Sequence, residues 1–233
     1  MPPEPGNGNG RRLVVNADDF GMTEQINAGI VRAHTDGIVT SCSLMVDAPA
    51  AGSAARLARS HPGLSVGLHF VEPPGADLDR RDVAGAELDR QLADFQTLMN
   101  ADPTHLDSHH HVHREGNRAA TFAAAASRMG IPVRGDGTVR YVGGFYGQWE
   151  WGITDLTHVS AEYLDWLLAH EVLEAATELG CHPAAGLEQL NSSYGHERVV
   201  ELDTLTQPGL RQRVAALGIR LVSFREISPV FMR

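Results

Sequence analysis

The chain has 233 residues, of which 42% are hydrophobic and 21% are charged, and its formal net charge is -10 with histidine neutral. This length and composition predict one globular domain that can bury a sizeable core. Because no basic excess is available to contact phosphates or an anionic bilayer surface, we expect neither a nucleic-acid partner nor a membrane partner.

The predicted elements are short β-rich runs that alternate with segments of helical period. In chain order they begin with strand 12–17, helix 23–36 capped by Gly37, strand 38–46, helix 48–60 and strand 64–70. They continue with loop 72–85, helix 86–99, strand 104–109, helix 116–129 capped by Gly130, and strand 132–134. The last are loop 135–155, rich in glycine and aromatic residues, helix 160–176, strand 177–182, loop 186–200, helix 207–217 and strand 219–224.

This alternation predicts the fold class. Strands that alternate with helices indicate a parallel sheet with right-handed crossovers. About seven such units in one domain predict an α/β fold, a closed or nearly closed (β/α) barrel with helices outside, rather than an open doubly wound sheet. No glycine-rich nucleotide-binding motif follows any predicted strand.

The sequence also indicates where the domain begins and in which compartment the protein resides. Residues 1–10 are rich in Pro, Gly and Asn, so we expect a disordered leader over residues 1–11 and a single domain over residues 12–233. No apolar run is long enough to cross a bilayer. Cys42 and Cys181 lack metal-ligand spacing, and two reduced, buried thiols in a cytoplasmic protein are favoured, although one disulfide stays open.

The first predicted strand ends in two adjacent acids, Asp18 and Asp19, with Gly21 close behind. Two ionised carboxylates side by side repel one another, and they persist where a cation neutralises them or where one holds a proton. We therefore interpret this strand end as the floor of a metal-dependent hydrolytic site. Taken alone, an Asp-Asp pair could also simply cap the following helix.

Other predicted strands also end in ionisable residues. These are His69, the run Asp107 to His113, Arg134 and His182. In a parallel barrel all such ends lie on one rim, the face where barrel enzymes keep their active sites. A lone histidine at a strand end is more often structural, but an acid pair, His69 and His109 at three separate strand ends favour a functional site.

The histidine-rich run from His109 to His113 has two structural interpretations. If the strand continues, side chains alternate, so Asp107, His109 and His111 share one face and His110 takes the other. His109 and His113 also have the spacing of two metal ligands on a helix. Val112 is β-branched and no helical pattern surrounds it, so the strand end is favoured.

One carboxylate and two imidazoles suit a catalytic metal site, because three protein ligands leave a coordination position for water. The metal would acidify that water and polarise a carbonyl. A second carboxylate would then act as general base, and a histidine across the site would protonate the leaving group. The adjacent acids can supply the ligand and the base, but adjacency does not say which acid plays which part.

The sequence resembles the YdjC-like carbohydrate deacetylases, whose chitooligosaccharide deacetylase members remove N-acetyl groups from short chitin fragments. The matching segments are residues 16–21, 37–41, 66–70, 104–113, 145–147, 181–184 and 201–205. The strings D-D-F-G at 18–21 and D-S-H-H-H-V-H at 107–113 are the most specific. The resemblance runs from Arg12 to Ile227, and the segment after His69 is shorter than in the chitooligosaccharide enzymes.

The resemblance implies a distorted (β/α) barrel, often dimeric, with one divalent metal ion. On the family pattern, Asp19, His69 and His109 are the metal ligands. The family is associated with Mg²⁺, whereas two imidazoles suit Zn²⁺ or another transition metal better.

The resemblance also assigns the catalytic groups. Asp18 falls at the position of the base, and His182 resembles the acid that protonates the leaving amine. Arg134 resembles an arginine that orients Asp18 or binds the oxyanion derived from the acetyl group.

Four further residues are expected to contact the substrate. They are Phe145, Tyr146, His111 and His113. For the aromatic residues of loop 135–155, two interpretations stay open: they form a platform for a sugar, or they pack within the protein.

The leading hypothesis is a metal-dependent hydrolase that removes an N-acetyl group from an acetylated amino sugar or oligosaccharide. Its partner would be a small carbohydrate substrate, and the resemblance is compatible with a homodimer. One alternative is a metal-dependent phosphoesterase or another amidohydrolase on a similar barrel, although Arg134 is the one obvious anion partner on the predicted rim. A second alternative is a non-catalytic sugar-binding or metal-binding protein. The acid pair and His182 argue against it, because a binder needs no general base.

Overall fold

Strands and helices alternate along most of the chain. The structure is a computed structural model that describes residues 10–173 and 175–228. The strands are β1 (Arg12–Phe20), β2 (Ser41–Leu44), β3 (Ser65–Phe70), β4 (Leu106–Ser108), β5 (Arg140–Val142), β6 (Gln148–Glu150), β7 (Ile153–Thr154), β8 (Ala176–Cys181) and β9 (Arg220–Leu221). The helices are α1 (Glu24–Thr35), α2 (Ala51–Ser60), α3 (Arg81–Met99), α4 (Arg118–Met129), α5 (Ala161–His170), α6 (His196–Leu205), α7 (Leu210–Ala216) and α8 (Phe224–Ile227), with 3-10 turns η1 (His109–Arg114) and η2 (Leu156–Val159).

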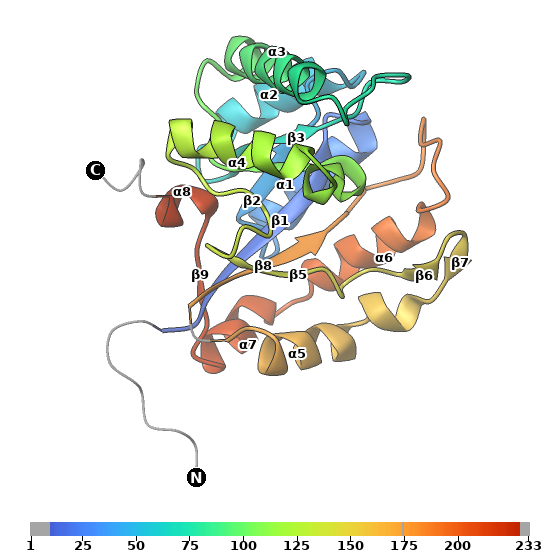
Figure 1. Cartoon of the computed structure of the whole chain (residues 1–233). Coiled ribbons are helices and arrows are strands. Elements are labelled where there is room, and N and C mark those ends of the chain that lie inside the picture. The colour runs from blue at the N-terminus through green and yellow to red at the C-terminus, as the bar shows by residue number, and fades with distance from the viewer. Residues whose placement is uncertain (1–9, 174, 229–233) are drawn as a thin grey trace.

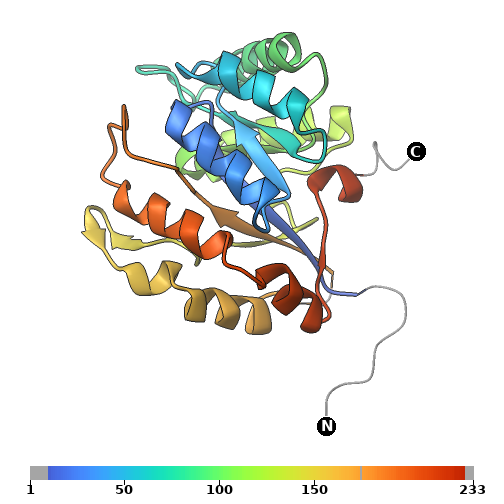
Figure 2. The same cartoon turned by 180° about the vertical axis from the view of Figure 1, so that it is seen from behind.

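The central layer is a curled parallel sheet. Its order is β4-β3-β2-β1-β8-β5, with β9 also paired to β1, and every one of these pairings is parallel. Figures 1 and 2 show helices around the outside of this sheet. The predicted α/β fold, a distorted barrel of about seven parallel strands with helices outside, is confirmed in the form of a half-barrel.

β1 lies in the middle of the sheet because its residues suit burial on both faces. Leu13, Val14 and Val15 are fully buried, as expected of a strand in a parallel sheet that helices cover. β1 is hydrogen-bonded to β2 on one side and to β8 on the other. Since parallel strands end at the same rim, residues that follow β1, β3, β4 and β8 are brought together there.

The prediction for residues 132–155 is wrong in its detail. The strand expected over residues 132–134 is reduced to a single bridge between Leu106 and Val133, because Gly135, with a φ of 81°, turns the chain away. The expected loop over residues 135–155 instead contains β5, which joins the main sheet, and the antiparallel hairpin of β6 and β7.

Several other boundaries also differ from the prediction. α3 begins inside the expected loop 72–85, α6 begins inside the expected loop 186–200, and α5 ends six residues early. The strand expected over residues 219–224 stops after β9, because Ser223 and Glu226 form a capping box that starts α8.

Gly37 has a different role from the cap that was predicted. Asp36 is the C-cap of α1, one residue earlier. A Cβ atom on Gly37 would lie 2.3 Å from the carbonyl oxygen of Leu205. Glycine is therefore required there by the close approach of α6 rather than by the end of the helix.

The remaining general expectations have mixed outcomes. Cys42 and Cys181 are buried free thiols, as favoured. No helix within residues 10–173 and 175–228 is long and apolar enough to cross a membrane. The leader expected over residues 1–11 lies outside the described residues except for its last two. Arg11 belongs to the folded part, since it donates hydrogen bonds to backbone oxygens of α5 and of Val172.

A buried histidine, His105, precedes β4 and packs between the sheet and α8. The ring of His105 stacks on that of Phe224 from α8, with centroids 3.8 Å apart. Its nitrogens lie 3.0 Å from Ser43 Oγ and 3.1 Å from Thr104 Oγ1. Burial lowers the pKa of His105 to about 4.

His105 should make stability depend on pH. Its pKa in the folded protein lies below the ordinary 6.5, so between these values the unfolded chain binds more protons and stability falls as the pH falls. The shift corresponds to about 3 kcal/mol. In urea titrations, the unfolding free energy of the wild type should fall by about this amount more than that of His105→Asn between pH 7 and pH 4. Equal slopes for the two proteins would contradict this assignment, and His170→Asn on the surface is the control.

Candidate active site

The end of β1 brings both members of the acid pair into one cleft. An alternating strand would point Asp18 and Asp19 to opposite faces. The register between β1 and β2 shifts between Ala17 and Phe20, and Asp19 has a φ of 68°, in the left-handed region that Asp tolerates better than most residues. This bulge breaks the alternation, and both carboxylates line a cleft of about 980 Å³.

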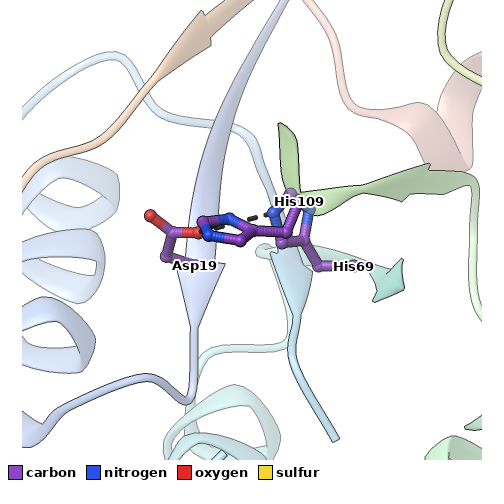
Figure 3. A group of neighbouring side chains, drawn as sticks. All are labelled: Asp19, His69 and His109. Atoms are coloured by element: carbon purple, nitrogen blue, oxygen red, sulfur yellow. Dashed lines mark ion pairs between the residues drawn. The ribbon is translucent and has the colours of Figure 1, made fainter. Parts of the chain in front are cut away.

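Three side chains from separate elements converge beside this bulge (Figure 3). Asp19 Oδ1 lies 3.4 Å from His69 Nε2 of β3 and 3.2 Å from His109 Nδ1 of η1. Their candidate ligand atoms all lie within 4.8 Å of one another. Asp19 Oδ1 is buried and accepts no well-formed hydrogen bond from any residue that the structure describes. A buried carboxylate oxygen that lies between two imidazoles without a hydrogen-bond partner fits a divalent cation.

The second oxygen of Asp19 is held by α6. Arg198 Nη2 donates to Asp19 Oδ2 over 2.6 Å. Burial on its own would raise the pKa of Asp19, but the charge of Arg198 and the two imidazoles keep this pKa well below its ordinary value. Asp19 therefore stays ionised with one oxygen fixed and the other facing the histidines.

A buried carboxylate also orients His69. Asp107 Oδ1 lies 2.8 Å from His69 Nδ1, an arrangement that typically fixes the tautomer and the ring of a metal-binding histidine. Burial lowers the pKa of His69, but the charges of Asp107 and Asp18 outweigh it and raise this pKa to about 10. The surroundings of His69 thus attract positive charge.

Arg134 is fully committed to carboxylates. It donates to both oxygens of Asp18 over 2.7 Å each, and its Nη2 lies 2.9 Å from Asp107 and 2.6 Å from Glu178. Burial raises the pKa of Asp18, yet Arg134 more than offsets this and the pKa is lowered. Of the two roles predicted for Arg134, this geometry suits the orientation of Asp18, because the buried guanidinium group does not line the cleft.

His182 follows β8 directly and faces Asp18 across the cleft, as predicted for strand 177–182. Its Nε2 lies 3.9 Å from Asp18 Oδ2. Its backbone N–H donates to Glu201 Oε2 over 2.5 Å, and Tyr194 donates its hydroxyl to the other oxygen of Glu201. Burial lowers the pKa of His182 to about 4 and raises that of Glu201 to about 8.

The prediction that residues 109–111 continue the strand is wrong. β4 ends at Ser108, and His110 and His111 have φ values of 54° and 57°. Ser108 Oγ lies 2.6 Å from His113 Nδ1 and accepts the backbone N–H of the same residue, which closes the turn. His109 reaches the cleft through this turn rather than through alternation along a strand.

The four residues expected to contact a substrate divide into two pairs. Tyr146 and His111 line the cleft. Phe145 is fully buried in the hydrophobic core, so its predicted contact with a substrate is corrected to a packing role. His113 is also buried, and its Nε2 lies 2.9 Å from the carbonyl oxygen of Arg134, so it supports the arginine instead of lining the cleft.

Sequence reasoning missed several supporting residues. Glu178 carried a usable signal, because a carboxylate inside a buried strand needs a cationic partner. Asp107 was placed on the correct strand without a role. Arg198 and Glu201 carried no such signal, because Arg198 fell in a segment predicted as a loop and helical spacing does not show which residues face a distant strand end.

The chain matches the family model described as YdjC-like protein over residues 12–76 and 74–216. It is 35% identical over 256 residues to a chitooligosaccharide deacetylase from Serratia marcescens, with 92% of this chain and 98% of that relative covered. It is 36% identical to a carbohydrate deacetylase from Geobacillus stearothermophilus, over 93% of this chain and 98% of that relative. A solved structure from Enterococcus faecalis V583, provisionally described as a cellobiose-phosphate cleavage protein, has a TM-score of 0.74 at 24% identity and covers 94% of this chain and 99% of its own.

The fold and the site define a (β/α) half-barrel protein with an aspartate–histidine group at its strand ends. Within that class, the chain belongs to the YdjC-like family, as its sequence motifs indicate. Its relatives include proteins named as carbohydrate and chitooligosaccharide deacetylases.

Removal of Arg134 should strongly destabilise the protein. Arg134→Gln leaves three buried carboxylates without their cation, and breaking a buried ion pair from one side typically costs about 3–5 kcal/mol. The unfolding free energy from denaturant titration should fall by this order. Arg128→Gln removes a solvent-exposed ion pair with Asp89, and its unfolding free energy should equal that of the wild type within experimental error. Similar small losses in both variants would contradict the central role of Arg134.

Proposed function

We propose that this protein is a metal-dependent hydrolase that removes an N-acetyl group from an acetylated amino sugar or a short oligosaccharide. The observation that carries the proposal is the buried Asp19 Oδ1, which has no hydrogen-bond partner within the described part of the chain and faces His69 and His109. Asp18 and His182 lie in the same cleft, where they can serve acid–base chemistry. The names of the relatives indicate the substrate class.

Asp19, His69 and His109 would hold one divalent cation. Such a cation supplies Lewis acidity, which polarises the acetyl carbonyl and acidifies a water molecule. The family resemblance favours Mg²⁺, while the donor set of two imidazoles and one carboxylate suits Zn²⁺ or another transition metal. Asp107 and Arg198 keep two of the three ligands in position through the contacts described above.

Asp18 is the proposed general base. Its two oxygens are fixed by Arg134, and a carboxylate that stays ionised can take the proton of the attacking water. Arg134 is a positioning residue in this proposal, because it reaches the reaction through Asp18.

His182 is the proposed acid that protonates the leaving nitrogen. Burial holds the imidazole neutral at rest, so it must gain a proton before it can donate one. Asp18, 3.9 Å away, is the group from which that proton can come once it has been taken from water. Glu201 fixes the backbone of His182 and so holds the ring toward the cleft.

Tyr146 and His111 are proposed to contact the sugar, since both line the cleft. We infer a small carbohydrate as the partner. The homodimer and the cytoplasmic location stay predictions. A phosphate ester is a poorer substrate for this site, because Arg134 and Arg198 are both engaged by carboxylates and phosphoryl transfer draws on free positive charge.

Deacetylation is tested by acetate release from N-acetylglucosamine and its oligomers. Activity should disappear with a chelator and return with added metal. Asp18→Asn should lower the rate at least about 100-fold, the usual size of a general-base contribution, while metal binding measured by calorimetry persists. Asp36→Asn, on the surface at the end of α1, is the control. Undiminished acetate release by Asp18→Asn would exclude the base assignment, and turnover of sugar phosphates alone would exclude deacetylation.

The support that Asp107 gives to His69 should be visible in metal affinity. Loss of such a partner typically weakens metal binding about 10–100-fold. Asp107→Asn should show this loss in calorimetric titration of chelator-treated protein, at temperatures where circular dichroism reports a folded chain. Asp94→Asn, on the exposed face of α3, should bind as the wild type does. Unchanged affinity in Asp107→Asn would mean that His69 is not a ligand or needs no orientation.

A further inference from the structure

One large aromatic side chain lies open to solvent at the edge of the cleft. Trp151, at the tip of the hairpin of β6 and β7, is 91% exposed and yet lines the same cleft as Asp19 and His182. An exposed indole beside a cleft is a place where a ligand can cover apolar surface. The reaction proposed above gives Trp151 no part.

The hairpin is held in a fixed position at its base. Gln148 donates to Glu197 Oε1 over 2.8 Å and to the carbonyl oxygen of Ser193 over 2.9 Å. Thr154 also donates to Glu197, which lies next to Arg198 on α6. The hairpin that carries Trp151 and the proposed metal ligand Asp19 are therefore both held by α6.

The neighbouring tryptophan shows what Trp151 lacks. Trp149, 63% exposed, donates its indole N–H to His158 Nδ1 over 2.6 Å and does not line the cleft. Its ring is already occupied by a protein partner. Trp151 has no ring partner of this kind among the described residues, so its faces are free for a ligand.

The chemistry of the cleft wall fits a sugar ring. The C–H face of a pyranose is apolar and packs on an indole, whereas its hydroxyls need hydrogen-bonding groups. Asn191, Ser192 and Ser193 supply such groups on the cleft lining. Pockets for one drug-sized ligand span about 300–1,000 Å³, and a cleft of about 980 Å³ has room for more than one ring.

We propose that Trp151 is a stacking platform for a second sugar ring, beside the ring that carries the reacting N-acetyl group. Trp151 would then make the site prefer a chain of at least two rings over a single sugar. This inference rests on the proposed function, and it assigns a specificity-determining role to a residue outside the acid–base and metal groups.

The test compares chain lengths. Acetate release is measured on N-acetylglucosamine and on its trimer with wild type, Trp151→Ala, Trp151→Phe and the control Trp166→Ala, which removes a 46% exposed tryptophan on α5. Trp151→Ala should lower kcat/KM on the trimer about tenfold, mostly through KM, and leave the monosaccharide unchanged. Trp151→Phe should restore most of the loss, and Trp166→Ala should behave as the wild type.

Equal effects of Trp151→Ala on both substrates, or no effect, would overturn the platform. The platform would also be overturned if light scattering showed that Trp151→Ala converts a protein dimer to a monomer while the kinetics on the sugar trimer stay unchanged. Trp151 would then be a contact between two copies of the chain. Absence of acetate release from every sugar by the wild type would defeat the proposed function instead. In that case, calorimetric titration with the sugar trimer still tests the platform. We expect the wild type and Trp166→Ala to bind the trimer, and Trp151→Ala to bind it about tenfold more weakly.

Discussion

Arg134 is fully buried, and its guanidinium group lies within 2.9 Å of three carboxylates, those of Asp18, Asp107 and Glu178. These acids come from β1, β4 and β8, so one side chain links three strands of the sheet. Asp18 is the proposed base, and Asp107 orients His69. The base and one proposed metal ligand therefore both depend on a single cation, which would be very costly to bury without them.

α6 supplies a second set of contacts that support the cleft. Arg198 binds Asp19, Glu201 binds the backbone of His182, and Glu197 anchors the hairpin that carries Trp151. One helix thus fixes a proposed ligand, the proposed acid and the edge of the cleft. The glycine at position 37, which lets the end of α1 approach Leu205 of this helix, belongs to the same set of constraints.

The parts of this arrangement that local patterns determine could be predicted from the sequence. Apolar runs and helical periods predicted the alternating fold, and parallel strand ends brought Asp18, Asp19, His69 and His182 to one rim. The bulge at Asp19 could not be predicted, because it depends on a positive φ that no local pattern requires. The short strand β5 and the hairpin were missed because glycine and aromatic residues also occur in loops.

Charge repulsion between the adjacent acids Asp18 and Asp19 is offset by two buried arginines. Two adjacent carboxylates should repel, yet each has its own buried arginine, Arg134 for Asp18 and Arg198 for Asp19. The arginines account for both oxygens of Asp18 but for one oxygen of Asp19. The asymmetry separates a carboxylate that is fully oriented from one that still faces two imidazoles. Adjacency in the sequence cannot make this distinction, because both arginines lie more than a hundred residues away along the chain. The division of labour that the family resemblance implies for the pair, base and ligand, agrees with which oxygens each distant arginine reaches.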